Sequence, residues 1–326
     1  RLDVHAGKGA YYISQLPKED LKWETGQSWG VAIEGRLFNK LNFNVEYFDR
    51  RNKDLIFNVY NPLSAGATDT TTPQSVTTMN LGTISNHGVE ISGDMDVYKS
   101  KNWSVNVGAS ITFEKNKVVK LPEQNRDGII DGTKKIVEGM DRYQFYTYTW
   151  EGVNTKNGLS LYKFNGDEYF FTDGGTTYGN PAGTEITGSQ KNDVVVIDGT
   201  PYSYLTTYGK REFHGSAMPT AYGSFNFSVS YKAFSLYTLF TYQLGGKVMD
   251  SNYQLLMNSQ STPTALHKDV LKGWTAEQAT ATDAIDRNGV PMLSDAPVIV
   301  SGLEADLNST SSIEDRKSGS AGMPRP

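Results

Sequence analysis

The sequence contains no cysteine, so a disulfide scaffold, a thiolate metal site and a cysteine nucleophile are all excluded. It also lacks any apolar run approaching the roughly 20 residues that a membrane-spanning helix needs. A strand of a membrane barrel requires only about 9–11 alternating residues, so this second absence leaves a β-barrel open. The net charge of -5 provides no basic stripe, which argues against nucleic acid as a partner.

The composition favours strands and loops over helices. Hydrophobic residues make up only 37% of the 326 positions, whereas aromatic residues reach 12%, with 19 Tyr. The 32 glycines suit turns, and aromatic side chains are enriched in strands. We therefore expect an all-β fold.

Six segments alternate apolar and polar residues, and this period of two is typical of a β-strand with one dry and one wet face. The connections between the segments are alternately short polar turns and long loops. This arrangement is typical of a bacterial outer-membrane barrel, so the sequence predicts an antiparallel transmembrane β-barrel segment with long extracellular loops. The six segments are 28–37, 41–47, 89–97, 103–113, 225–231 and 234–244.

The alternation assigns the side chains to two faces. A Lys or Arg at mid-depth on a lipid face costs about 2–4 kcal/mol, and the apolar faces contain neither. The residues predicted to meet hydrocarbon are Trp29, Val31, Ile33, Leu37, Leu41, Phe43, Val45 and Tyr47. Those predicted to line a watery lumen are Glu34, Arg36, Asn42, Asn44, Glu46, Glu90, Asp94, Asp96, Asn106 and Glu114. A soluble β-sandwich, whose strands also alternate, is the alternative.

We divide the chain into a lead-in segment or loop at 1–26, barrel strands at 27–250, and an extracellular loop at 251–326 that ends in a tail resembling a cloning remnant. The long extracellular loops are predicted at 52–82 and 115–220, and one short helix at 264–274. The amino end shows no signal peptide. Six strands leave open edges that lipid cannot satisfy, so we expect the chain to be an internal piece of a longer protein.

Two segments are weighed as binding sites. Residues 123–134 resemble an EF-hand calcium loop, but Lys134 stands where a bidentate Glu is needed, so we favour a simple Asp-Gly turn. The aromatic stretch 143–150, with Tyr162, Tyr169 and Phe170 nearby, suits either a stacking platform for sugar rings or packing between strands, and we favour packing.

Catalytic chemistry is not predicted. The four histidines, His5, His87, His214 and His267, have no metal-type spacing. We therefore expect a protein that is not an enzyme, with no catalytic, metal or cofactor-binding residues and no cofactor. The substrate-binding residues are not identifiable from the pattern.

Several segments, in the same order, resemble the SusC/RagA family of TonB-dependent outer-membrane transporters. They are 22–25, 43–56, 80–91, 116–122, 215–219, 222–226 and 242–248.

The resemblance implies a barrel of about 22 strands closed by an amino-terminal plug. It also implies a SusD-like surface lipoprotein as partner, an oligosaccharide or peptide as cargo, and the TonB–ExbB–ExbD machinery pulling on an amino-terminal TonB box. This chain has no recognisable TonB box, plug or final strand, so we expect a part of the barrel wall.

The predicted function is import of a large nutrient, preferably an oligosaccharide, across the outer membrane of a Gram-negative bacterium, with outer-membrane lipid around the barrel. Two alternatives stay open: a soluble β-sandwich carbohydrate-binding module, and a siderophore or vitamin receptor of the same barrel type.

Overall fold

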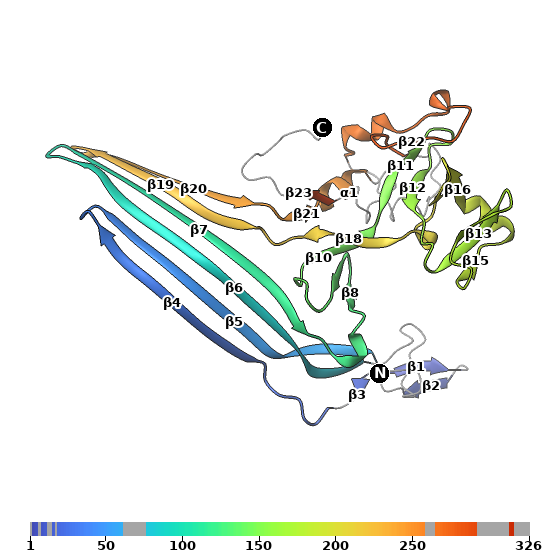
Figure 1. The fold of residues 1–326 in the computed structure, drawn as a ribbon, viewed down its shortest axis with the longest axis horizontal. Coiled ribbons are helices and arrows are strands. Elements are labelled where there is room, and N and C mark those ends of the chain that lie inside the picture. Colours follow the sequence, from blue (N-terminus) through green and yellow to red (C-terminus); the bar gives the residue numbers. More distant parts are fainter. Residues whose placement is uncertain are drawn as a thin grey trace. The chain divides into compact units, whose positions relative to one another are not determined.

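The computed structural model describes residues 2–5, 8–11, 15–16, 18–60, 76–257, 265–291 and 313–315, and its elements are mostly β-strands (Figure 1). The chain divides into two compact units. Unit 1 comprises 1–144, 216–246 and 316–326, and unit 2 comprises 145–215 and 247–315.

Unit 1 is dominated by one antiparallel sheet with the strand order β20-β19-β7-β6-β5-β4 (Figure 1). All six alternating segments lie within these strands, as predicted. The strands are β4 (Thr25–Leu37), β5 (Leu41–Tyr60), β6 (Val76–Lys99), β7 (Trp103–Lys120), β19 (Ala221–Tyr231) and β20 (Phe234–Leu244). At the amino end, β1 (Leu2–His5) pairs with β2 (Lys8–Tyr11), and β3 (Gln15–Leu16) runs parallel to β6.

Successive strands meet in tight turns at one end of the sheet, which we call the short-turn end. These turns occupy 38–40, 100–102 and 232–233. Asn39 and Lys232 adopt φ values of 54° and 50°, the left-handed conformation that tight hairpin turns require. The opposite end, where β5 connects to β6 and β7 to β19, is the long-loop end.

The strands extend further toward the long-loop end than the sequence predicted. Residues 52–82 were expected to form a loop, but β5 and β6 stay paired as far as Tyr60 and Val76. The prediction was wrong there because the alternation of apolar and polar residues ends at Phe48, whereas the backbone pairing of β5 with β6 continues beyond it.

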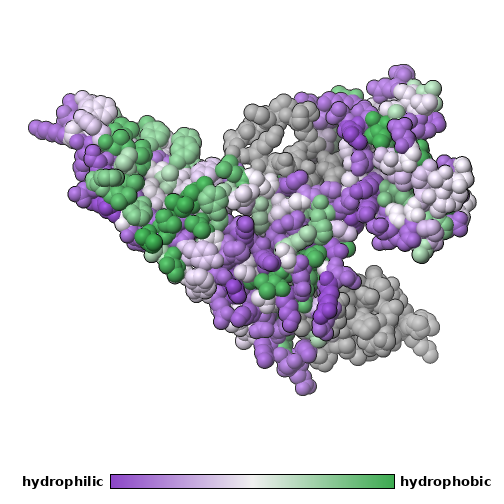
Figure 2. Space-filling model, viewed as in Figure 1, coloured by the Kyte–Doolittle hydropathy of each residue, from purple (hydrophilic) through white to green (hydrophobic). Residues whose placement is uncertain are grey.

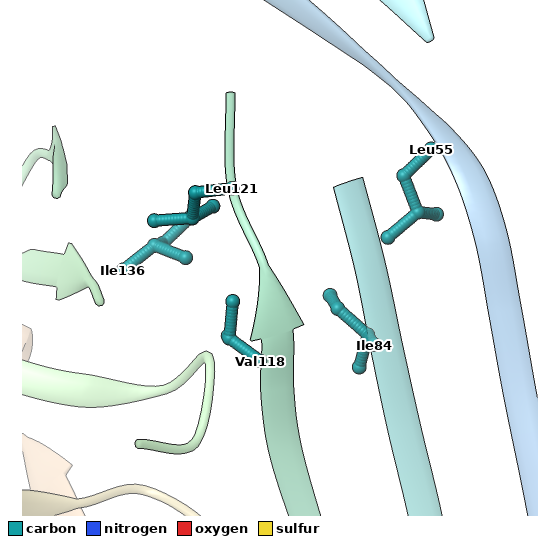
Figure 3. Packing of buried hydrophobic residues seen from close by; sticks show 5 residues of the cluster. All are labelled: Leu55, Ile84, Val118, Leu121 and Ile136. Carbon is teal, nitrogen blue, oxygen red and sulfur yellow. The ribbon is translucent and has the colours of Figure 1, made fainter. Parts of the chain in front are cut away.

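The start of the connection after β7 folds back onto the sheet within unit 1. It contains η2 (Glu123–Asn125), β8 (Ile129–Asp131) and β9 (Lys134–Ile136). Its side chains join those of β5, β6 and β7 in a buried cluster (Figure 3) of Leu55, Ile84, Val118, Leu121 and Ile136.

Unit 2 contains small sheets, of which the largest has the order β16-β17-β12-β11-β22. Its strands are β10 (Gln144–Tyr148), β11 (Trp150–Asn154), β12 (Ser160–Lys163), β13 (Tyr169–Asp173), β14 (Thr176–Gly179), β15 (Thr184–Glu185), β16 (Val194–Ile197), β17 (Thr200–Ser203), β18 (Arg211–Ser216), β21 (Lys247–Met249), β22 (Ile285–Asp286) and β23 (Ile313–Asp315). Its helices are η3 (Gly188–Asp193), η4 (Thr206–Tyr208), α1 (Ser251–Met257), η5 (Lys268–Lys272) and η6 (Ala276–Gln278).

Two predictions are corrected in unit 2. The segment 115–220 is not simply a loop, because much of it packs around a buried cluster of Phe164, Phe171, Ile186, Val194 and Tyr208. Its strands are too short for a period of two to stand out. The helix expected at 264–274 is instead the short 3-10 helix η5, capped by His267; residue 264 lies outside the described residues.

Candidate functional site

The sheet of unit 1 carries apolar side chains on one face, in rows that run across the strands. Residues paired across antiparallel strands point to the same face. Ile33 pairs with Val45, Val45 with Ile91, and Ile91 with Ile111. Figure 2 shows hydrophobic residues gathered over the long strands. These side chains are exposed in unit 1; Ile33, for example, retains 66% of its accessible surface.

We call this side the apolar face. The register places every residue predicted to meet hydrocarbon on it. Between its two aromatic borders it contains no charged residue among those that the strand pairings place there. It consists of Trp29, Val31, Ile33, Leu37, Leu41, Phe43, Val45, Tyr47, Val89, Ile91, Met95, Trp103, Val105, Val107, Ala109, Ile111, Phe113, Phe225, Phe227, Val229, Tyr231, Phe234, Leu236, Phe240 and Tyr242.

The height of the apolar face matches a bilayer. The ten residue steps from Trp103 to Phe113 correspond to about 33 Å along the strand, or about 25 Å in height at a tilt of about 40°. Aromatic pairs mark both borders: the Trp29 and Tyr47 ring centroids are 5.4 Å apart, and those of Trp103 and Tyr231 are 4.4 Å apart. Aromatic girdles at the two interfaces are typical of outer-membrane barrels.

The opposite side, the polar face, holds all the residues predicted to line a lumen. Its side chains form hydrogen bonds between strands: Asn42 Nδ2 donates to Asp94 Oδ2 at 3.0 Å, and the Ser110 and Ser224 hydroxyls are 2.9 Å apart. A groove of about 700 Å³ runs across this face and includes Glu34 in its lining. A wall with one apolar and one polar face can separate lipid from a water-filled passage.

One row of the polar face is filled by a single aromatic ring. Phe48 is 4% exposed and lies in a row between Gly30 and Gly88. A Cβ atom on Gly88 would lie 2.7 Å from the Phe48 ring and 2.2 Å from the Phe113 carbonyl oxygen. Glycine is therefore required at position 88, and the guanidinium of Arg50 covers the ring at 4.9 Å from its centroid.

The two faces exchange polarity toward the long-loop end. In the middle of β6, Ile91 lies on the apolar face and Glu90 on the polar face. Further along the same strand, Ile84 points to the polar side and is buried at 5% exposure, whereas His87 lies on the side of the apolar face. The apolar-out arrangement is therefore confined to a band of the sheet.

The calcium-loop resemblance corresponds to a turn. Gly128 has φ 97°, and its backbone N–H donates to the Asn125 carbonyl oxygen at 2.9 Å. Among the described residues, no three His, Asp or Glu side chains are grouped as metal ligands. Within the same residues, no helix is long and apolar enough to cross a membrane.

Part of the aromatic stretch 143–150 packs between strands, as we favoured, although Tyr143 is exposed. Phe145 of β10 is 3% exposed, and Tyr162 of β12 is completely buried. Tyr146 contacts Phe213 with ring centroids 5.1 Å apart, and Tyr148 meets Tyr162 edge-on at 6.4 Å. The rings of Phe145 and Tyr162 cannot stack on a sugar without unpacking this core.

Unit 2 also contains a polar cluster that the sequence did not reveal, because its members come from separate strands. Lys163 Nζ lies 2.8 Å from Glu212 Oε1, and the Thr149 hydroxyl donates to Glu212 Oε2 at 3.0 Å. His214 Nε2 lies 3.2 Å from both the Thr149 hydroxyl and the Thr147 carbonyl oxygen. Burial lowers the pKa of His214. Burial alone would raise the pKa of Glu212, but the hydrogen bonds from Lys163 and Thr149 outweigh it and the pKa is lowered.

A second cluster in unit 2 centres on Asn154, which is completely buried. Its amide nitrogen is 2.8 Å from Asp283 Oδ1 and 2.7 Å from the Tyr204 hydroxyl. Lys156 Nζ lies 3.0 Å from Asp283 Oδ2. The hydrogen bond from Asn154, helped by Lys156, lowers the pKa of Asp283. Both clusters hold short strands together.

The four histidines lie in four different parts of the chain. His5 lies in β1, His87 on the sheet, His214 in the first cluster of unit 2, and His267 before η5, where its Nδ1 accepts from the Asp269 backbone N–H at 3.2 Å.

Comparisons with known proteins agree with this two-faced wall. The chain matches the family model described as TonB dependent receptor-like, beta-barrel over residues 6–247. The TonB-dependent receptor SusC of Bacteroides thetaiotaomicron is 26% identical over 134 residues, which cover 40% of this chain and 13% of SusC.

Among solved structures, the RagAB peptide transporter has a TM-score of 0.65 at 20% identity, over 97% of this chain and 30% of that chain. The RagAB peptide importer in its open-open state has a TM-score of 0.59 at 18% identity, over 97% of this chain and 29% of that chain. The fold is therefore shared, and this chain spans less than a third of the length of these relatives.

Proposed function

Because this chain belongs to the TonB-dependent receptor-like β-barrel family of the Gram-negative outer membrane, we propose that it forms part of the wall of an importer for a large nutrient. The observation that carries this proposal is the apolar face, about 25 Å high, backed by a polar face with a groove. The first side meets acyl chains, and the second lines the passage. The domain division proposed for the whole protein follows from this: barrel strands cross the membrane, and the connections at the long-loop end lie outside the cell.

The proposed partner is a SusD-like surface lipoprotein, and the proposed source of energy is the TonB–ExbB–ExbD machinery. The similarity to the TonB-dependent receptor SusC supports this assignment. The whole protein then acts as a conduit and not as an enzyme.

For the cargo, we propose an oligosaccharide, with a peptide as the second candidate. The aromatic stretch no longer supports a sugar, because Phe145 and Tyr162 are buried in unit 2. The RagAB structures are those of a peptide transporter, but their identity to this chain, 20% or less, supports only the fold. The two cargo classes therefore have to be separated by experiment.

The test is a deletion of the gene in its host, complemented with the full-length protein. Growth is measured with oligosaccharides, peptides or iron chelates as the limiting nutrient. We expect the deletion to abolish growth on one large nutrient and complementation to restore it. If the deletion abolishes growth on peptides alone, a peptide replaces the oligosaccharide as the proposed cargo. If it abolishes growth on iron chelates alone, the siderophore-receptor alternative is favoured. Unchanged growth on every nutrient, or recovery of the protein without detergent in the soluble fraction, would contradict the import proposal.

A further inference from the structure

Unit 1 has a second pocket, on the side of the apolar face and directly beyond its border at the long-loop end. Its volume is about 640 Å³. The lining includes Tyr47, which belongs to the last row of the apolar face, and Arg51, His87 and Lys117 beyond it. The pocket thus joins an apolar floor to a polar rim.

The strand pairing sets the depth of this rim. The last apolar row contains Tyr47, Val89 and Phe113. In the next row His87 pairs with Lys115, and in the row after that Ser85 pairs with Lys117. Successive rows on one face are two residues apart, about 7 Å along the strand. The cations therefore begin within one such step of the end of the apolar band.

The side chains on this side form what we call the basic rim: Arg51, Lys53, Lys115 and Lys117. The two nearby carboxylates are already engaged. Asp49, which is 5% exposed, accepts hydrogen bonds from Arg51 Nε and Nη2 at 3.2 Å each, and Glu138 Oε1 accepts from the Leu121 backbone N–H at 2.6 Å.

Lys115 and Lys117 form no ion pair with any residue that the structure describes. The rim therefore offers two uncompensated ammonium groups beside a pocket, at the level where a bilayer passes from acyl chains to headgroups. Ammonium groups bind phosphate as compact point charges, and lysines near an anionic membrane surface attract it.

Outer-membrane barrels place short turns in the periplasm and long loops outside the cell, so the rim lies in the outer leaflet. We propose that the basic rim binds the phosphorylated headgroup of an outer-leaflet lipid, whose acyl chains lie on the apolar face below Tyr47 and Phe113. Lys115 and Lys117 contact the phosphate, and the pocket beside Arg51 and His87 accommodates the headgroup. This site goes beyond the proposed transport function and rests only on the membrane position of the apolar face.

The test measures lipid binding to the full-length protein in detergent by native mass spectrometry. The probes are lipid A carrying both phosphates, dephosphorylated lipid A, and inorganic phosphate. The variant is Lys115→Gln with Lys117→Gln. Its matched control, Lys99→Gln with Lys101→Gln, removes the same charge at the short-turn end.

Removing two lysines that each contribute to headgroup attraction is expected to weaken binding of phosphorylated lipid A about thirtyfold. The control variant is expected to bind like the unaltered protein. Dephosphorylated lipid A and inorganic phosphate are both expected to bind much more weakly than the intact lipid, because each lacks one half of the site.

Equal binding by the lysine variant and the unaltered protein would overturn the proposal. Binding of dephosphorylated lipid A as tight as that of phosphorylated lipid A would also overturn it. Inorganic phosphate binding as tightly as the lipid would overturn it too, because the site would then bind free anions and not a lipid. Heat-dependent mobility on gels reports whether each variant still forms a barrel. If the Gln variant fails to fold, two other measurements decide. The variant Lys115→Arg with Lys117→Arg must still bind phosphorylated lipid A, and binding of this lipid to the unaltered protein must weaken as salt is added. If either result is not obtained, the proposal is overturned. Nutrient uptake is measured in the separate growth experiment, so a failure to detect lipid binding does not affect the test of the import proposal.

Discussion

The sheet of unit 1 and the small sheets of unit 2 handle the same kind of residue in opposite ways. In unit 2, Leu161 is completely buried and Val153 is 1% exposed. On the apolar face of unit 1, Ile33 is 66% exposed and Leu236 is 58% exposed. A period of two in the sequence indicates that a strand has one apolar and one polar face. The elements and molecules around the strand decide which solvent each face meets. For the apolar face that solvent is lipid.

Along the sheet of unit 1, the apolar side chains change from exposed on the apolar face to buried on the polar side. Within the apolar band, apolar side chains point away from the polar face; at the long-loop end, Ile84 and Val118 turn to the polar side and are buried under Leu121 and Ile136 (Figure 3). A strand that leaves the bilayer must hide its apolar residues from water, so the same chain reverses its polarity at the border.

The largest expected effect comes from cutting the same side chain in both regions. Leu161→Ala leaves a cavity in unit 2 and is expected to lower the free energy of unfolding of unit 2 by about 2–5 kcal/mol. Leu236→Ala on the apolar face leaves space that fluid acyl chains can fill, so its effect should be smaller. Hydrogen exchange of β11, β12 and β17 for Leu161→Ala, and of β19 and β20 for Leu236→Ala, measures the difference. Equal loss of protection in the two variants would break the comparison.

A charge placed on each face of one strand sharpens the comparison. Ile91→Arg puts a cation on the apolar face and is expected to cost about 2–4 kcal/mol at mid-depth, reducing the amount of assembled barrel. The neighbouring Glu90→Arg lies on the polar face, where Glu46 is its cross-strand partner, and should assemble normally. Heat-dependent gel mobility of outer-membrane fractions reports both. Normal assembly of Ile91→Arg would show that the apolar face does not meet lipid.

Two asparagines bonded to aspartates separate buried from exposed polar contacts. Asn154→Ala removes the amide that donates to the Asp283 carboxylate inside unit 2, and we expect a loss of about 1–3 kcal/mol. Asn42→Ala removes a similar hydrogen bond to Asp94 on the exposed polar face, where water can replace it. The loss of stability should therefore be well below about 1 kcal/mol, that is, below the range of about 1–3 kcal/mol expected for Asn154→Ala. Thermal unfolding of the full-length variants is the measurement. A larger loss for Asn42→Ala would reverse this reasoning.

The smallest effect is a dependence on pH in unit 2. Because burial holds the pKa of His214 below its ordinary value, the unfolded chain binds more protons than the folded one between pH 6.5 and that lowered value. Stability should therefore fall as the pH drops through this window and level off below it. The groups facing His214 are Thr147, Thr149, Glu212, Lys163 and Lys247.

Hydrogen exchange of β10 and β18 at several pH values tests this, with His214→Gln as the control in which the slope from pH 6.5 downward should disappear. A stability of these strands that rises on acidification would contradict the assignment. The lowered pKa values of Glu212 and Asp283 act at lower pH, where their carboxylates become protonated.

The strands that cross the apolar band could be predicted from sequence because lipid on one side and water on the other enforce strict alternation. All six were found, and the two predicted sets of side chains, from Trp29 to Tyr47 and from Glu34 to Glu114, fall on opposite faces. The short turns expected between segments were also found, for example at 232–233 between β19 and β20.

The rest could not be predicted for physical reasons. Residues 49–54 of β5 are all polar, and the apolar residues at 55–57 follow one another without alternation, so no period of two marks the strand although its ladder continues to Tyr60. In unit 2 the strands are only a few residues long, and the contacts that assemble its clusters join residues far apart, such as Asn154 and Asp283. The basic rim was hidden because its lysines become one surface only when β5, β6 and β7 are in register.

The central claim, that β6 separates lipid from a water-filled passage, is tested most directly by spin labels attached to single cysteines at positions 84–95 of the full-length protein in bilayers. Within the band, oxygen accessibility should peak at Val89, Ile91 and Met95, and accessibility to a water-soluble nickel complex at Glu90 and Asp94. Position 87 should lose the preference for oxygen. Water-soluble reagent reaching Ile91 as readily as Glu90 would contradict the account.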